Sequence, residues 1–232
     1  MAEPFGRVSI RRLIAVPAVI TLAVTLLRLV GELLHWSPKL FSREAGGAGA
    51  LVGIVWLLPV FGVYFAMLLN QAGYGPSSRG RAIGLPLAAI AVAVAAGFAI
   101  FQLSPSIVAT VVLTDLAAFL PLWIAYRGWP ELGRVAIYYG LAARVPVAIV
   151  MLVAMSANWG THYELGPPGF PEMGLLAKWI VIGVIPQLCL WIAFTVIVGS
   201  LFGSLSLLFQ RRPGVSAPIS QDAAAKRMSA HS

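Results

Sequence analysis

The sequence predicts an all-α, polytopic integral membrane protein: a bundle of six transmembrane helices with both termini on the same side. Of its 232 residues, 59% are hydrophobic and only 10% are charged, and the mean hydropathy is +0.89. A helix needs about 20 mostly apolar residues to cross the hydrocarbon of a bilayer. Six stretches reach this length, at residues 13–36, 46–69, 82–101, 106–126, 132–155 and 175–209.

The six stretches occupy most of the chain and leave no room for a water-soluble domain. We expect a cytoplasmic segment at residues 1–12, the transmembrane domain at 13–209 and a disordered cytoplasmic tail at 210–232, which is rich in alanine and serine. The first stretch is longer than the apolar part of a cleaved signal peptide, typically about 7–15 residues. We therefore expect it to remain as the first helix.

The distribution of basic residues predicts the orientation, because cytoplasmic loops are enriched in Lys and Arg. With six crossings, one side receives most of them: Arg7, Arg11, Arg12, Arg79, Arg81, Arg127, Arg134, Arg211, Arg212, Lys226 and Arg227. The other side receives only Lys39, Arg43 and Lys178. This predicts a multi-pass protein of the cell inner membrane with both termini in the cytoplasm. The net charge of +8 is then explained by membrane orientation and anionic lipids, not by nucleic acid.

Prolines and small residues predict the shape and packing of the helices. A proline occurs in every stretch, as Pro17, Pro59, Pro86, Pro121, Pro146 and Pro186. Such prolines either only bend the helices or open a central cavity and act as hinges. Two G-x-x-x-G pairs, Gly49 with Gly53 and Gly199 with Gly203, predict faces where helices approach closely.

Two charged residues are predicted at mid-membrane depth in neighbouring helices. Asp115 lies about 16 Å and Arg144 about 18 Å from the tight turn that joins the fourth and fifth stretches. Because an unpaired charge there costs about 2.5–3.5 kcal/mol, we expect a direct ion pair. The pair is either structural, or part of an anion-binding or proton-relay site; the remaining alternative is that the two residues face separate partners. Gln187, next to Pro186, either caps a carbonyl freed by the proline or lines the same cavity.

The first stretch carries a polar stripe. Thr21, Thr25, Arg28, Glu32 and His35 follow spacings of 4, 3, 4 and 3 residues, which places them on a strip about 80° wide. Such a stripe must avoid lipid, so it forms either a polar seam against another helix or the wall of an outward-facing cavity. The charges of Arg28 and Glu32 can neutralise each other, because the two residues are four apart.

Four residues are candidates for a site at the outer face. His35 lies at the outer end of the first stretch, and His162 and Glu164 lie in the longest outer loop, with Glu32 nearby. Histidines and carboxylates bind zinc, but these spacings match no closed zinc motif. The sequence therefore predicts no metal and no cofactor.

Three functions fit the sequence. Small-solute or ion/proton transport is favoured, along a polar path lined by Arg28, Glu32, Asp115, Arg144 and Gln187. A second hypothesis is a structural or assembly subunit of a membrane complex. A third is a membrane enzyme acting on lipid or quinone head groups with Glu32, His35, His162 and Glu164. No nucleotide-binding or hydrolase motif occurs, which favours a protein without enzymatic activity.

The expected partners follow from the prediction of a multi-pass membrane protein. The lipid bilayer is the predicted environment, a small molecule or ion is the predicted ligand for the transport hypothesis, and nucleic acid is not expected. Assembly into a homo- or hetero-oligomer stays open, and so does the identity of the substrate.

Overall fold

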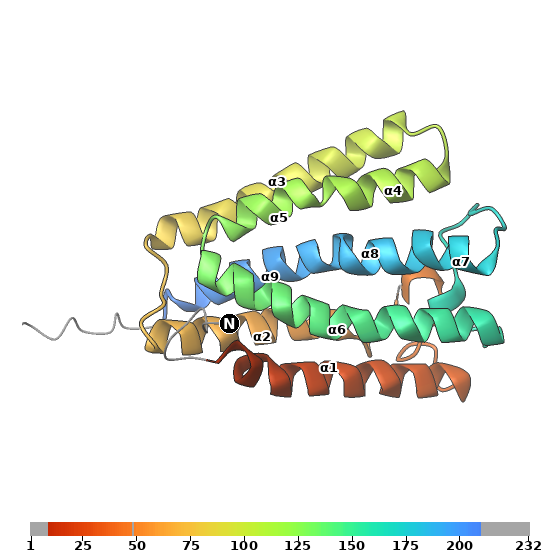
Figure 1. The fold of residues 1–232 in the computed structure, drawn as a ribbon, viewed down its shortest axis with the longest axis horizontal. Helices are drawn as coiled ribbons and strands as arrows, with labels where there is room; N and C mark the ends of the chain where they lie inside the picture. The colour runs from red at the N-terminus through yellow and green to blue at the C-terminus, as the bar shows by residue number, and fades with distance from the viewer. Residues whose placement is uncertain (1–8, 48, 210–232) are drawn as a thin grey trace, which may run out of the picture.

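The computed structural model describes residues 9–47 and 49–209, and this part of the chain is 76% helical and contains no strand. It confirms the all-α class. Six helices or helix series in it are long and apolar enough to cross a membrane: Ile10–Leu33, Ile54–Gln71, Arg79–Leu103, Ile107–Tyr126, Pro130–Ala157 and Leu175–Ser206 (Figure 1). The predicted tail, 210–232, and residues 1–8 of the predicted cytoplasmic segment lie outside the described residues.

Half of these spans are uninterrupted α-helices and half are composite. The uninterrupted ones are α1 (Ile10–Leu33), α3 (Arg79–Leu103) and α6 (Pro130–Ala157). The second span joins a 3-10 turn (Ile54–Trp56) to α2 (Leu57–Gln71), and the fourth joins α4 (Ile107–Ala117) to α5 (Phe119–Tyr126). The sixth consists of α7 (Leu175–Lys178), a π-helical segment (Trp179–Val184), α8 (Ile185–Leu188) and α9 (Leu190–Ser206).

The helices run side by side, so the connections gather at two opposite ends of the bundle. The start of α1, the α2–α3 connection and the α5–α6 turn lie at one end, and the remaining connections between spans lie at the other (Figure 1). The first end carries Arg79, Arg81 and Arg127, whereas Lys39 and Arg43 belong to the second. We call them the arginine-rich end and the loop end.

The second span begins later than predicted. The expected helix at 46–69 is wrong at its start, because Gly46, Gly47 and Gly49 have φ angles of 66°, 73° and 75°. This left-handed conformation suits glycine and cannot continue a right-handed helix. The Gly49–Gly53 pair is therefore part of a loop, and the prediction of a helix-packing face there was wrong.

The other glycine pair does pack closely. A Cβ atom at Gly62 of α2 would lie 2.5 Å from the carbonyl oxygen of Gly199 in α9, and one at Gly203 would lie 2.7 Å from the carbonyl oxygen of Gly62. The two backbones are in direct contact, as small residues at helix interfaces allow. This confirms the packing predicted for Gly199 and Gly203.

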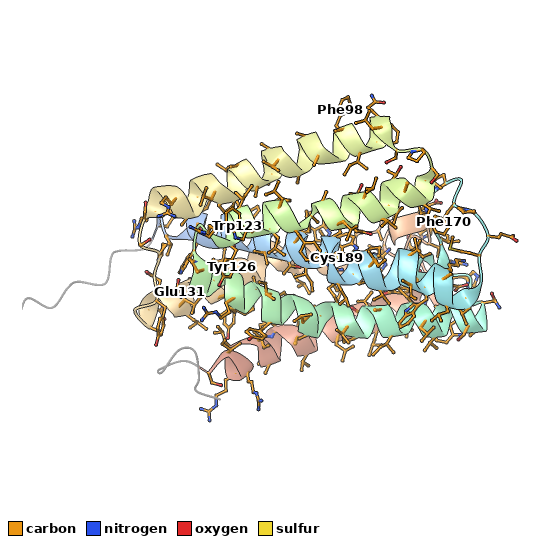
Figure 2. All side chains as sticks on the ribbon, turned by 45° about the horizontal axis from the view of Figure 1, so that its top comes forward. Phe98, Trp123, Tyr126, Glu131, Phe170 and Cys189 are labelled. Atoms are coloured by element: carbon orange, nitrogen blue, oxygen red, sulfur yellow. The ribbon has the colours of Figure 1, made fainter. Side chains whose placement is uncertain are left out.

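The bundle is apolar both inside and outside. At the arginine-rich half, a core includes Phe61, Phe65, Leu132 and Tyr139. On the outside, Phe98 of α3 is 67% exposed and points away from the bundle (Figure 2). Large exposed apolar patches are rare on soluble monomers, so this surface fits a helix bundle surrounded by lipid.

Replacing Gly62 by alanine should destabilise the bundle by about 1–3 kcal/mol, because the new methyl group would force α2 and α9 apart. Gly84→Ala is the matched control, since a Cβ at this α3 position meets nothing within 4 Å and alanine favours helix. Thermal unfolding of the purified chain in detergent measures both. Equal melting temperatures for the two variants would contradict the close packing.

Candidate functional site

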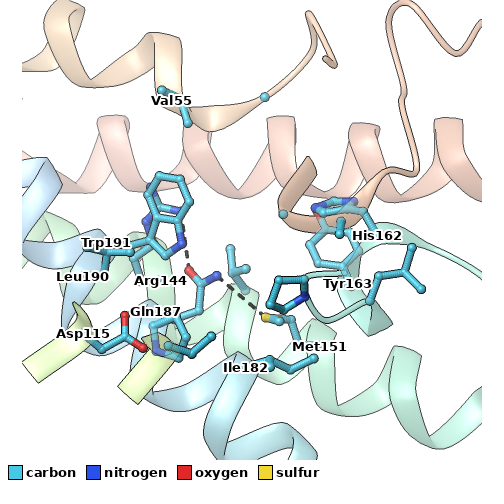
Figure 3. Close-up of a pocket in the computed structure, with 18 of the residues that line it drawn as sticks. Val55, Asp115, Arg144, Met151, His162, Tyr163, Ile182, Gln187, Leu190 and Trp191 are labelled. Carbon is cyan, nitrogen blue, oxygen red and sulfur yellow. Dashed lines mark hydrogen bonds between the residues drawn. The ribbon is translucent and has the colours of Figure 1, made fainter. Parts of the chain in front are cut away.

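A cavity of about 470 Å³ lies in the loop-end half of the bundle. Its walls come from α1, α4, α6, the π-helical segment, α8, the start of α9 and the loops that follow α1 and α6 (Figure 3). Most lining residues are apolar, and the polar side chains among them include Thr25, Asp115, Arg144, His162, Tyr163 and Gln187. A largely apolar cavity with a few converging polar groups is typical of a small-molecule site.

The predicted ion pair between Asp115 and Arg144 is wrong: both residues line the cavity, but they do not pair. The reason is the position of α8, which packs against both α4 and α6 and lies between them (Figure 1). The partner of Arg144 is therefore Gln187 of α8, and not Asp115 of α4. The Arg144 Nη1 atom donates a long hydrogen bond of 3.5 Å to Gln187 Oε1.

The guanidinium of Arg144 is held against an aromatic ring. Its Cζ atom lies 4.5 Å from the centre of the Trp191 ring, which is a cation–π contact. Trp191 was not among the site residues predicted from the sequence. The signal was available, because Trp191 follows Gln187 by four residues and so shares its helix face.

Asp115 and Arg144 are buried and incompletely satisfied. They are 1% and 3% exposed, and neither Asp115 Oδ2 nor Arg144 Nη2 has a hydrogen-bond partner among the described residues. A buried polar atom without a partner costs about 1–3 kcal/mol, and more if it is charged. Both residues line the cavity, so the two unpartnered atoms lie at its wall.

The Arg28–Glu32 interaction predicted from their spacing is confirmed, with 2.9 Å between Nε and Oε1. The Nη2 atom of Arg28 also donates to the carbonyl oxygens of Ser42 and Gly47, at 3.1 Å each. The glycine-rich loop between α1 and the second span, residues 34–53, thus folds over the end of α1 and places two carbonyl oxygens on Arg28. The contact through Gly47 depends on its left-handed backbone, which also removes the start of the helix expected at 46–69.

Glu32 also fixes the loop after α6. The backbone N–H of His162 donates to Glu32 Oε2 at 2.9 Å, and His162 Nδ1 lies 2.5 Å from Glu32 Oε1. Burial lowers the pKa of His162 below its ordinary value, and the hydrogen bond to Glu32 opposes this. The neighbouring Tyr163 is also buried; its hydroxyl donates to the carbonyl oxygen of Thr25 at 3.4 Å, and burial raises its pKa.

The polar stripe on α1 is confirmed except at His35. Thr21, Thr25 and Glu32 are buried and Arg28 is nearly so, whereas His35 is exposed. Helix α1 ends at Leu33, and the backbone at His35 turns into the left-handed region with φ of 56°. The prediction that His35 continues the stripe was therefore wrong.

The four outer-face candidates do not form one cluster. Glu164 accepts hydrogen bonds from Thr161, at 3.1 Å from the backbone nitrogen and 3.2 Å from the hydroxyl, so it caps a short 3-10 turn (His162–Glu164). Of the four, only Glu32 and His162 contact each other. Within the part of the chain that the structure describes, no group of three or more His, Cys, Asp or Glu could hold a metal ion.

The helix that carries Gln187 is irregular beside the cavity. A π-helical segment lies one turn before Gln187, and π-helical turns occur frequently at functional sites. At Ala118, three residues after Asp115, and at Cys189, two residues after Gln187, the backbone stays in the right-handed helical region, and hydrogen bonds between residues four apart continue on both sides. The α4–α5 and α8–α9 junctions are therefore mild irregularities within continuous helices.

No protein-family model, curated protein or solved structure matches this chain. The functional argument therefore depends on the geometry of the cavity.

Stability should decrease as the pH falls below about 6.5, the ordinary pKa of histidine. The pKa of His162 is lowered in the folded protein, so the unfolded chain binds a proton there before the folded chain does, which favours unfolding in acid. His162→Gln should flatten the pH dependence of the melting temperature between pH 7 and pH 5. The control His35→Gln replaces an exposed histidine and should leave the slope unchanged; equal slopes in wild type and His162→Gln would contradict the assignment.

Proposed function

We propose that this protein is a membrane transporter that binds a small polar solute beside Arg144 and Asp115. The observation that supports it is a pair of buried ionisable side chains, one acidic and one basic, each with an unpartnered atom, on the wall of one 470 Å³ cavity (Figure 3). Ionisable residues inside membrane bundles typically mark substrate or ion pathways.

The two side chains select the chemistry of the solute. The guanidinium of Arg144 offers N–H donors to an anionic oxygen, and such charge-assisted bonds are the strong ones. The carboxylate of Asp115 accepts a hydrogen bond from an ammonium or hydroxyl group. A solute that carries both an anionic group and a nearby donor would satisfy both residues at once, so we expect a zwitterion or a hydroxylated anion.

The incomplete hydrogen bonding of Arg144 favours transport over a purely structural role. The π-helical segment before Gln187 supports this choice, because such segments occur frequently at functional sites. The core around Phe61, Phe65 and Tyr139 fills the arginine-rich half, and the buried ionisable pair lies in the half that holds the cavity. A structural subunit gains nothing from leaving Arg144 without a full set of partners.

Binding is tested with phosphoethanolamine, which has a phosphate and an ammonium, and with phosphocholine, which lacks the N–H donors. Wild type should bind phosphoethanolamine more tightly. Arg144→Gln should weaken both by at least about tenfold, because each loses its phosphate partner, and Asp115→Asn should mainly reduce the preference between them. The control Arg127→Gln removes an exposed arginine at the arginine-rich end and should change neither affinity.

Counterflow of labelled phosphoethanolamine in proteoliposomes separates transport from binding. Uptake is expected with wild type and with Arg127→Gln, and not with Arg144→Gln. Binding without counterflow would overturn the transport proposal, and binding that is insensitive to Arg144→Gln would overturn the site.

We also propose that the arginine-rich end faces the cytoplasm of a cell with an inner membrane, as the distribution of basic residues favours. Cys189 is the single cysteine, so Cys189→Ser gives a background for labelling with a membrane-impermeant maleimide. In intact cells a cysteine at Gly174, at the loop end, should react, and one at Ser77, at the arginine-rich end, should not. The reverse result would invert the topology.

A further inference from the structure

We infer that the solute is the head group of a single-chain lipid, and that its tail lies in an apolar groove next to the cavity. This inference rests on the proposed function, because it takes the polar head to be held by Arg144 and Asp115. It adds the class of the substrate and the route by which it leaves the cavity sideways, toward the surrounding lipid.

The groove lies between α3, the α4–α5 span and α9 and has a volume of about 90 Å³. Its walls are formed mainly by small and aliphatic residues, among them Ala93, Gly97, Ile100, Ala193 and Ile197. Among the described residues that line it, none is charged, and Thr114 alone has a polar side chain. An apolar space of this kind favours hydrocarbon over water.

The groove and the cavity are adjacent. Thr114 of α4 and Leu190 of α9 line both of them. Asp115, the residue after Thr114, lines only the cavity, so α4 presents its carboxylate to one space and an apolar face to the other. A molecule that spans this boundary needs a polar part on the Asp115 side and an apolar part on the other side.

The groove is narrow and short, so it can hold only the part of one extended tail that lies next to the head group. On α3 the lining residues run from Ala93 to Ile100 and on α9 from Leu190 to Ile197, which is about 10 Å along each helix axis. Phe194, also in the lining, is 36% exposed on the outside of the bundle. A tail in the groove would therefore continue into the lipid around the protein.

Two glycines on α3 provide a matched pair of variants. A Cβ atom at Gly97 or at Gly84 would meet nothing within 4 Å, so phenylalanine fits at either position without displacing a neighbour at its Cβ. Gly97 lines the groove, and Gly84 does not. Gly97→Phe therefore fills the groove, while Gly84→Phe adds the same side chain elsewhere on the same helix.

The test compares myristoyl lysophosphatidylethanolamine with glycerophosphoethanolamine, which has the same head and no tail. Binding to the purified full chain is measured in one detergent for wild type, Gly97→Phe, Gly84→Phe and Arg144→Gln, with the melting temperature of each variant recorded. Gly97→Phe should weaken binding of the lipid at least about tenfold and leave glycerophosphoethanolamine unchanged. Gly84→Phe should change neither, and Arg144→Gln should weaken both.

The outcomes separate the two proposals. If Arg144→Gln weakens both compounds but Gly97→Phe leaves lipid binding unchanged, the tail does not use the groove, and this inference is overturned while the proposed function stands. If wild type binds neither compound, or Arg144→Gln changes neither, the proposed function fails and the inference fails with it. A lipid carrying a photoreactive group at the end of its tail gives a second measurement: crosslinks within 93–100 or 190–197 are expected, and crosslinks only elsewhere overturn the tail position.

Discussion

The carboxylate of Glu32 joins three parts of the chain that are far apart in sequence. It pairs with Arg28, whose guanidinium also binds the carbonyls of the glycine-rich loop, and it accepts the hydrogen bonds of His162 from the loop after α6. Because Glu32 is 1% exposed, these contacts form in a weakly screening environment and are stronger than they would be in water. Both loops at the loop end of the cavity are therefore held by this ion pair, one through Arg28 and the other through Glu32.

The position of α8 between α4 and α6 determines which partners Asp115 and Arg144 have in the cavity. By separating α4 from α6, α8 leaves Arg144 with a long hydrogen bond to Gln187 and the face of Trp191, and leaves Asp115 without a hydrogen bond to any described residue. Such an arrangement is costly for an empty bundle. The cost becomes useful when a ligand with complementary charges replaces the missing partners, and this is the physical basis of the proposed site.

The proposals on solute and tail follow from the two sides of α4. On one side of α4, Asp115 lines the cavity together with Arg144. On the other side, α4 lines the groove, whose other walls include alanine, glycine and isoleucine residues. A helix that separates a polar space from an apolar one matches the two halves of an amphiphile.

The sequence by itself determined the all-α class, the approximate positions of the six apolar spans, the Arg28–Glu32 pair and most of the α1 stripe, because these depend on local composition and on helical periodicity. It could not determine that Asp115 and Arg144 stay apart, since the intervening α8 is more than 40 residues further along the chain than Arg144. Nor could it place His162 on Glu32, across 130 residues. Contacts between distant segments are decided by packing and by loop conformation, which residue spacing within one helix does not encode.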